Sequence, residues 1–135
     1  MLRLFPDTVP TLDALCGAGV KTGLVSNRQF ARNPAEYLGI ADKFDVIIGL
    51  EDVTHAKPDP EPLLTALSRL GVEAAQAVYV GDTDIDMKTA AAAGVRGIGV
   101  TTGNFGAEQH LAAGARHVCA HLAEVLPLCE VEPRK

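Results

Sequence analysis

Residues 77–94 read AVYVGDTDIDMKTAAAAG, an apolar run followed by three aspartates and an alanine-rich segment. β-Branched and aromatic side chains favour a strand over residues 77–80. The segment from Ile85 to Ala93 is predicted to be a helix, and Gly94 is placed to end it. Alanine side chains are small, so this helix can approach a sheet closely. The stretch therefore predicts a strand, a tight acidic turn and a helix.

The same alternation runs through the rest of the chain. Further strands are expected at residues 20–25, 44–48, 97–100 and 117–119, and helices at 10–18, 34–38, 60–70, 107–113 and 122–128. Short strands that alternate with helices indicate a parallel sheet with helices on both faces. The continuous apolar run Val46-Ile47-Ile48 agrees, because parallel strands are buried on both sides. We predict an α/β fold with a doubly wound, Rossmann-like parallel sheet of about five strands, in one domain over residues 1–135.

The composition excludes several classes of protein. With 47% hydrophobic and 21% charged residues, the 135-residue chain is expected to be neither disordered nor membrane-spanning. Its net charge of −5 and its lack of tryptophan argue against a basic, stacking surface for nucleic acid. The first seven residues are too short an apolar stretch for a signal peptide, and the three cysteines indicate neither a zinc site nor a disulfide framework. We therefore expect a cytoplasmic protein that binds neither nucleic acid nor membranes.

Polar residues follow the ends of three predicted strands. They are Ser26, Asn27, Lys57, Asp82 and Asp86. Right-handed crossovers bring the carboxyl ends of parallel strands to one edge of the sheet, where ligands of open α/β sheets bind. Hydroxyl and ammonium groups donate to phosphate oxygens, and carboxylates hold Mg²⁺. The set indicates a phosphate site that also binds Mg²⁺.

Each of these residues also has an ordinary structural interpretation. Ser26-Asn27 could form only a turn after a strand, and Lys57 could be a solvated loop lysine. For Asp84, between the other two aspartates, we favour a helix-capping role, because aspartate is common there and suits the helix dipole. Asp82 and Asp86 are harder to explain in this way, because clustered aspartates repel one another unless a cation or a helix N-terminus offsets their charge.

Taken together, these residues resemble the haloacid dehalogenase (HAD) superfamily, in particular its phosphoglycolate phosphatase-like branch. The resemblance runs from about Leu4 to Leu128. The family's second motif, a Ser or Thr at a strand end that is often followed by Asn, is matched by Ser26-Asn27. Its third motif, Lys-Pro-x-Pro, is matched by residues 57–60, and its fourth, Gly-Asp-x-x-x-Asp after a strand, by residues 81–86.

The resemblance implies a role for each matched residue. Ser26, Asn27 and Lys57 would bind the substrate phosphate, and the lysine would also offset negative charge on the reacting groups. Asp82 and Asp86 would hold Mg²⁺ directly or through water. The family reaction transfers a phosphoryl group from a small phosphorylated molecule to an aspartate, and water then hydrolyses the aspartyl phosphate.

The family's first motif has no match in this sequence. That motif, Asp-x-Asp-x-Thr or Val, carries the nucleophile at the end of the first, central strand, and a helical cap usually follows it. The residues before Ser26 contain no Asp-x-Asp, and Asp7, in Phe5-Pro6-Asp7-Thr8, is interpreted as a turn or cap residue because no buried strand precedes it. Without the central strand, the strands that end at Ser26 and Asp82 must pair directly or leave apolar edges open, and an open edge would allow a homodimer.

The missing first motif leaves two possible functions for the chain. The chain is either the core of an HAD phosphatase whose N-terminal part lies outside it, through a misplaced start codon or a truncated gene, or a pseudoenzyme or interaction module that binds phosphate and Mg²⁺ without turnover. In both cases we expect the chain alone to be inactive, because the covalent route has no nucleophile. A receiver domain of the two-component type fits poorly, because its acidic residues precede its lysine and here Lys57 precedes Asp82.

Overall fold

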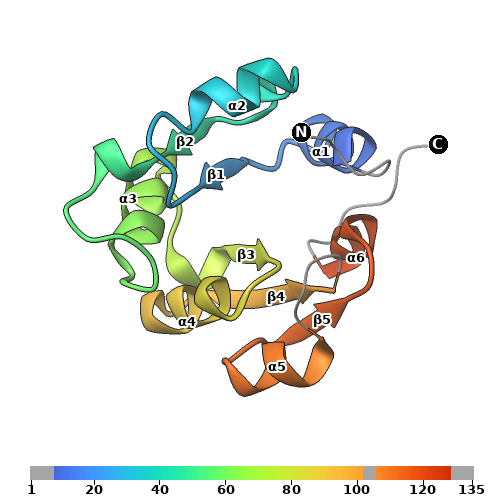
Figure 1. The fold of residues 1–135 in the computed structure, drawn as a ribbon. Helices are drawn as coiled ribbons and strands as arrows, with labels where there is room; N and C mark the ends of the chain where they lie inside the picture. Colours follow the sequence, from blue (N-terminus) through green and yellow to red (C-terminus); the bar gives the residue numbers. More distant parts are fainter. Residues whose placement is uncertain (1–7, 102–105, 129–135) are drawn as a thin grey trace.

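A computed structural model describes residues 8–101 and 106–128 of the chain (Figure 1). The strands are β1 (Gly23–Val25), β2 (Val46–Ile48), β3 (Val78–Gly81), β4 (Arg96–Val100) and β5 (His117–Cys119). The helices are α1 (Thr8–Gly17), α2 (Arg32–Tyr37), α3 (Glu61–Leu70), α4 (Asp84–Ala93), α5 (Ala107–Ala112) and α6 (Val125–Leu128). The predicted order of strands and helices is confirmed, and so is the α/β fold. The interpretation of Asp7 lies outside the described residues.

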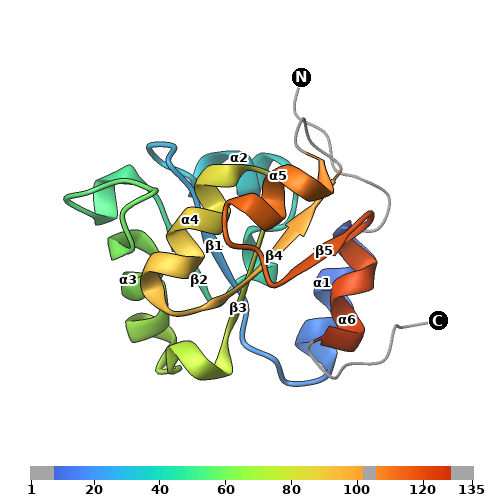
Figure 2. The same ribbon diagram turned by 90° about the horizontal axis from the view of Figure 1, so that it is seen from below.

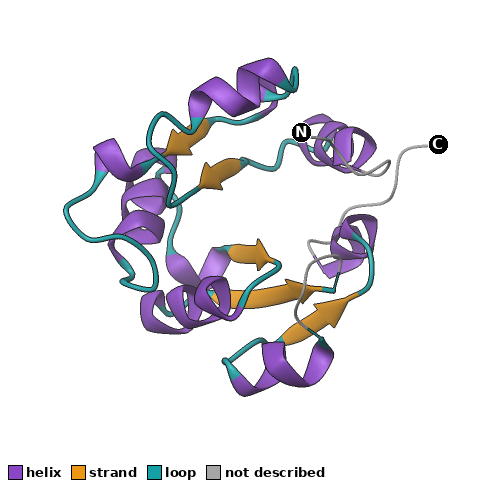
Figure 3. Ribbon diagram, viewed as in Figure 1, coloured by secondary structure: helices purple, strands orange, loops and turns teal. Residues whose placement is uncertain are grey.

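The strands form two parallel sheets. One contains β1 and β2, with Gly23 opposite Val46, and the other has the order β3-β4-β5, with Val80 opposite Ile98. The helices lie on the outside of both sheets (Figure 3). Within the described part of the chain no strand pairs with the facing edges of β1 and β3. Of the two arrangements that the sequence allowed, the structure therefore has the one with open edges.

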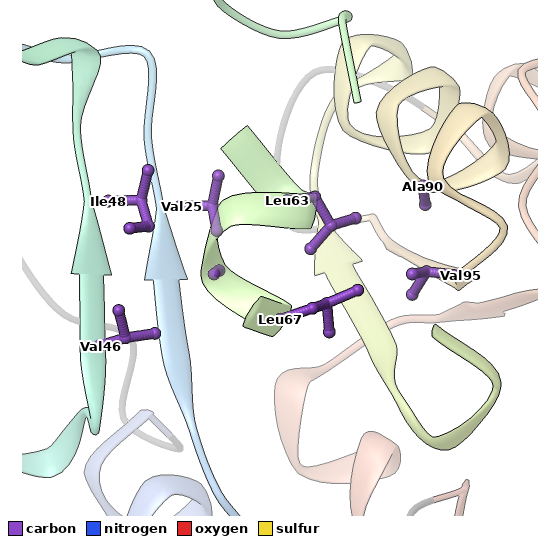
Figure 4. Packing of buried hydrophobic residues seen from close by; sticks show 8 residues of the cluster. Val25, Val46, Ile48, Leu63, Leu67, Ala90 and Val95 are labelled. Atoms are coloured by element: carbon purple, nitrogen blue, oxygen red, sulfur yellow. The ribbon is translucent and has the colours of Figure 1, made fainter. Parts of the chain in front are cut away.

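Helix α3 connects the two sheets through the largest part of the core. The cluster consists of Val25, Val46, Ile48, Leu63, Ala66, Leu67, Ala90 and Val95. In Figure 4 the side chains of Leu63 and Leu67 lie between β1 and the C-terminal half of α4. A second contact joins the two ends of the chain, because α1 lies beside α6 (Figure 2) and Ala14 packs against Leu126. Buried apolar surface therefore holds the two sheets in place without a ladder between them.

The start of α4 corrects one prediction. The N-cap is Thr83, whose extended backbone precedes the helix and whose hydroxyl accepts a hydrogen bond from the Asp86 amide at 3.3 Å. Asp84, predicted to cap the helix, is instead its first residue. Its Oδ2 lies 3.5 Å from Nζ of Lys88, one turn later in the helix. Its charge still lies at the positive end of the helix dipole. Gly94 ends the helix with φ at 74°, as predicted from the sequence.

The helices of the described ranges are all too short or too polar to cross a lipid bilayer.

Candidate active site

The carboxyl ends of β1 and β3 border a cavity of about 520 Å³. Of the five predicted site residues, four line it, namely Ser26, Lys57, Asp82 and Asp86. They come from the end of β1, from the loop before α3, from the turn after β3 and from the first turn of α4. The structure thus brings together residues that are up to 60 positions apart in the sequence.

Lys57 forms a buried ion pair with Asp86. Its Nζ lies 2.6 Å from Asp86 Oδ1, and the two side chains are only 11% and 10% exposed. The ammonium has three N–H donors, and the other two point toward the Tyr79 hydroxyl at 3.0 Å and the Val25 carbonyl at 3.4 Å. Lys57 is therefore not a solvated loop lysine, because every donor of its ammonium has an acceptor inside the protein.

Asp86 is fixed by its own helix terminus as well as by Lys57. Its Oδ2 accepts a hydrogen bond from the Thr83 hydroxyl at 2.9 Å. Gly81 provides the space for this carboxylate, because a Cβ at residue 81 would overlap the Asp86 side chain. Both carboxylate oxygens thus bind protein donors, which explains how a carboxylate can be buried here.

Asp82 differs from Asp86 in exposure and in contacts. Its side chain is exposed, and it makes no hydrogen bond or ion pair within the described residues, although it lines the cavity. The described ranges contain no group of three or more His, Cys, Asp or Glu residues that could hold a metal ion by themselves. One accessible carboxylate still fits Mg²⁺, which is often held by one or two carboxylates together with substrate phosphates and water.

Ser26 and Asn27 play different parts at the end of β1. The Ser26 hydroxyl accepts a hydrogen bond from the Arg28 amide at 3.1 Å, so it does form a turn, but it can still donate its proton toward the cavity. The Asn27 side chain bonds the main chain of Lys57 in both directions, accepting from the amide at 2.9 Å and donating to the carbonyl at 3.1 Å. These two bonds fix the Lys57 backbone against the end of β1. A phosphate contact of Asn27 stays a prediction.

Tyr79 is a site residue that the sequence did not reveal. Its hydroxyl lies 3.0 Å from Lys57 Nζ, 3.3 Å from the Val25 carbonyl and 3.4 Å from Asp86 Oδ1. Its ring centroid is 5.6 Å from the ammonium, within the range of a cation–π contact. Burial and the neighbouring Asp86 carboxylate raise the pKa of Tyr79 well above its ordinary value, so the hydroxyl keeps its proton. The available signal was that a tyrosine in an apolar strand needs a partner for its hydroxyl.

Comparison with known proteins identifies the family. The sequence model of haloacid dehalogenase-like hydrolases matches residues 1–100. A phosphoglycolate phosphatase of Salmonella paratyphi A is 45% identical over 106 residues, which are 76% of this chain and 42% of that protein. A phosphoglycolate phosphatase of Yersinia pseudotuberculosis is 41% identical over 128 residues, which are 93% of this chain and 55% of that protein.

A solved structure shows the same fold. The HAD phosphatase from Thermococcus onnurineus superimposes with a TM-score of 0.85 at 32% identity, over 98% of this chain and 60% of that one. The chain thus spans about half the length of the relatives that it matches. From the match over residues 1–100 and the arrangement of Ser26, Lys57 and Asp82 around one cavity, the chain belongs to the haloacid dehalogenase-like hydrolase family.

Proposed function

We propose that residues 1–135 form a single core domain of a phosphatase that binds a small phosphorylated molecule together with Mg²⁺. The observation that carries the proposal is the Lys57 ammonium, which is held at the cavity that Ser26 and Asp82 also line. An ammonium and a hydroxyl donate to phosphate oxygens, and a carboxylate beside them suits a hard cation. The family and the names of the relatives support this function.

Each residue of the site has a distinct part in the proposal. Ser26 and Lys57 bind the phosphate. Asp82 binds Mg²⁺ directly, and Asp86 binds it through water. Mg²⁺, when bound, offsets the negative charge of the phosphate oxygens. Asn27 fixes the main chain of Lys57 through its two hydrogen bonds, and Tyr79 orients the ammonium. Lys57 can turn one N–H from the Val25 carbonyl, its longest contact at 3.4 Å, toward a bound phosphate.

We further propose that these 135 residues bind phosphate without hydrolysing its esters. The sequence before Ser26 has no Asp-x-Asp that could serve as nucleophile and general acid/base. The covalent route of the family would then have no attacking group within this chain. The same proposal places the protein in the cytoplasm, where the free thiols of Cys16 and Cys119 are stable.

Binding is tested by isothermal titration calorimetry with inorganic phosphate, in the presence and absence of Mg²⁺. We expect affinity to fall about tenfold or more in Ser26→Ala and in Asp82→Asn, which both remove a single group. Lys88→Met, at an exposed lysine of the adjacent helix α4, should leave the affinity unchanged. Equal affinity of the wild type and both site variants would contradict the proposed site.

Turnover is tested separately with p-nitrophenyl phosphate and Mg²⁺. We expect no hydrolysis above background by the 135-residue protein. Hydrolysis that disappears in Asp82→Ala would contradict the non-catalytic part of the proposal and leave the phosphate site intact.

A further inference from the structure

The loop that carries Lys57 is not held in place by apolar packing. Val53 packs at the margin of the core cluster, and α3 begins at Glu61. Between them, residues 54–56 are exposed and belong to no helix or strand. Exposed segments with few buried apolar contacts are the parts of a protein that open most easily. The path of this loop, and with it the point from which the Lys57 side chain starts, therefore depends on polar contacts.

The carboxylate of Glu61 supplies these contacts at the start of the loop. Its Oε2 accepts a hydrogen bond from the Thr54 amide at 2.6 Å, and its Oε1 accepts one from the His55 amide at 3.1 Å. Hydrogen bonds to an ionised acceptor are about twice as strong as those between neutral groups. The bond from the Thr54 amide, ahead of those from His55, lowers the pKa of Glu61 below its ordinary value. The carboxylate is therefore ionised at neutral pH and binds two consecutive amides of the loop.

Glu61 is not occupied by its own helix. An acidic residue in the first turn of a helix often binds the free amides at that end. In α3 this part is taken by Asp59, whose Oδ1 accepts from the Glu61 amide at 2.9 Å. Within the described residues, the side-chain contacts of Glu61 all go to residues 54 and 55. The Glu61 carboxylate thus joins the loop to the start of α3.

A second polar contact holds the loop on the other side. The Asn27 side chain bonds the amide and the carbonyl of Lys57, at 2.9 and 3.1 Å, and so joins residue 57 to the end of β1. The Lys57 side chain has a flexible four-carbon stem. Its ammonium can stay beside Asp86 at the cavity only while the main chain of the loop remains within reach. Both ends of residues 54–57 are therefore fixed by side chains that bind main-chain groups.

We propose that Glu61 is a positioning residue of the phosphate site, which acts by holding the loop in the path that presents the Lys57 ammonium to the cavity. The inference rests on the proposed function of Lys57 as a phosphate ligand. Among the described residues that line the cavity of about 520 Å³, Glu61 is not one, so its effect on phosphate must pass through Lys57. The two amide bonds carry this role, because the contact with the His55 imidazole, at 3.0 Å, involves a ring that is 68% exposed.

NMR of the phosphate-free protein tests the positioning role by itself. In Glu61→Ala, the amides of Thr54 and His55 should exchange at least about tenfold faster than in wild type, because each loses a charged acceptor. The resonances of the Lys57 ammonium should shift and broaden in the same variant. The Ile98 amide lies in the interior of the β3-β4-β5 sheet and should keep its protection, which shows that the variant remains folded.

Calorimetry with inorganic phosphate and Mg²⁺ then measures the effect on the site. Glu61→Ala should lower phosphate affinity about tenfold. Glu61→Gln keeps one carbonyl oxygen that can accept from one amide, so its affinity should lie between those of Glu61→Ala and wild type. His55→Ala removes the imidazole and leaves both amide bonds, so it should bind phosphate like wild type. Glu36→Ala, which makes the same change at an exposed glutamate of α2, should also leave the affinity unchanged.

Each outcome separates this inference from the proposed function. Lys57 resonances that are the same in Glu61→Ala and in wild type would overturn the positioning role, whatever the protein binds. Altered resonances with unchanged phosphate affinity would overturn it as well. Glu61→Gln as impaired as Glu61→Ala would contradict the part given to the amide bonds, and so would a loss in His55→Ala equal to that in Glu61→Ala. A wild type that binds no phosphate would instead contradict the proposed function, and the Lys57 resonances would still decide whether Glu61 positions the ammonium.

Discussion

The ammonium of Lys57 lies 2.6 Å from the carboxylate of Asp86, and both side chains are about nine-tenths buried. Each charge offsets the other in a place where water cannot. Lys57 comes from the loop before α3 and Asp86 from the first turn of α4. The pair therefore fixes the position of the proposed phosphate-binding ammonium and at the same time ties two elements of the fold together.

Removal of the Asp86 carboxylate should destabilise the protein strongly. Asp86→Ala would leave the Lys57 ammonium buried without a counter-charge, so we expect a loss of about 3–5 kcal/mol in the free energy of unfolding. Urea denaturation followed by circular dichroism measures it. Asp84→Ala, in the same turn, removes the more exposed pair with Lys88 and a charge at the positive end of the helix dipole, and should cost about 1 kcal/mol or less. Equal losses in the two variants would mean that the buried pair is not a stabilising contact.

Gly81→Ala should displace the Asp86 carboxylate without changing any charge. The added methyl group would overlap the Asp86 side chain, and relief of the overlap must displace either β3 or the start of α4. We expect a loss of about 1–3 kcal/mol in the free energy of unfolding and weaker phosphate binding. Gly106→Ala is the matched control, because the nearest atom to its new Cβ is 3.9 Å away. A Gly81→Ala variant as stable as wild type would show that this close approach is not required.

The pH dependence of stability should report on Tyr79. Burial and the Asp86 carboxylate raise its pKa above the ordinary value, so the folded protein keeps the phenol proton when the unfolded chain has lost it. Stability from this group is therefore complete below about pH 10 and is lost as the pH rises above it, by up to about 1.4 kcal/mol per pH unit. Urea denaturation between pH 9 and about pH 11 should show a shallower decline for Tyr79→Phe than for wild type. Parallel declines would contradict the assignment.

Leucine-to-alanine substitutions on α3 should destabilise the protein by amounts that depend on how deeply each leucine is buried in the core cluster. Leu67 is 7% exposed and packs among residues of both sheets, whereas Leu64 on the same helix is 45% exposed. Leu67→Ala should cost about 2–5 kcal/mol in the free energy of unfolding, and Leu64→Ala about 1 kcal/mol or less. Thermal denaturation of the two variants provides the comparison. Similar costs would show that α3 does not bridge the sheets as described.

The sequence predicted the elements well because their signals are local. Apolar runs that end in Gly, Ser or Asp, such as Val78–Gly81, place the strands, and glycines such as Gly94 mark the helix ends. The four cavity residues followed from a topological rule, since parallel strands finish at one edge. Their convergence at one cavity agrees with that rule.

The remaining features depend on contacts between distant residues. Asn27 bonds the main chain of Lys57, 30 positions away, and no periodicity reveals which side chain will take that part. Tyr79 resembled a core residue because its ring is apolar, and its function comes from three acceptors and donors that only the fold brings near. The N-cap is Thr83, one residue before the predicted Asp84. Residue propensities do not locate the start of a helix to within one residue.

Helix α3 packs against both sheets and so sets their relative position, which has a consequence for ligand affinity. Ser26 follows a strand of one sheet and Asp82 a strand of the other, so the proposed phosphate site would consist of two halves whose spacing depends on the packing of Leu63 and Leu67. A phosphate that contacted both halves would hold them together. Its binding free energy would therefore include the cost of bringing the two halves to the right spacing. Affinity for phosphate would then report on the packing of a helix that never touches it.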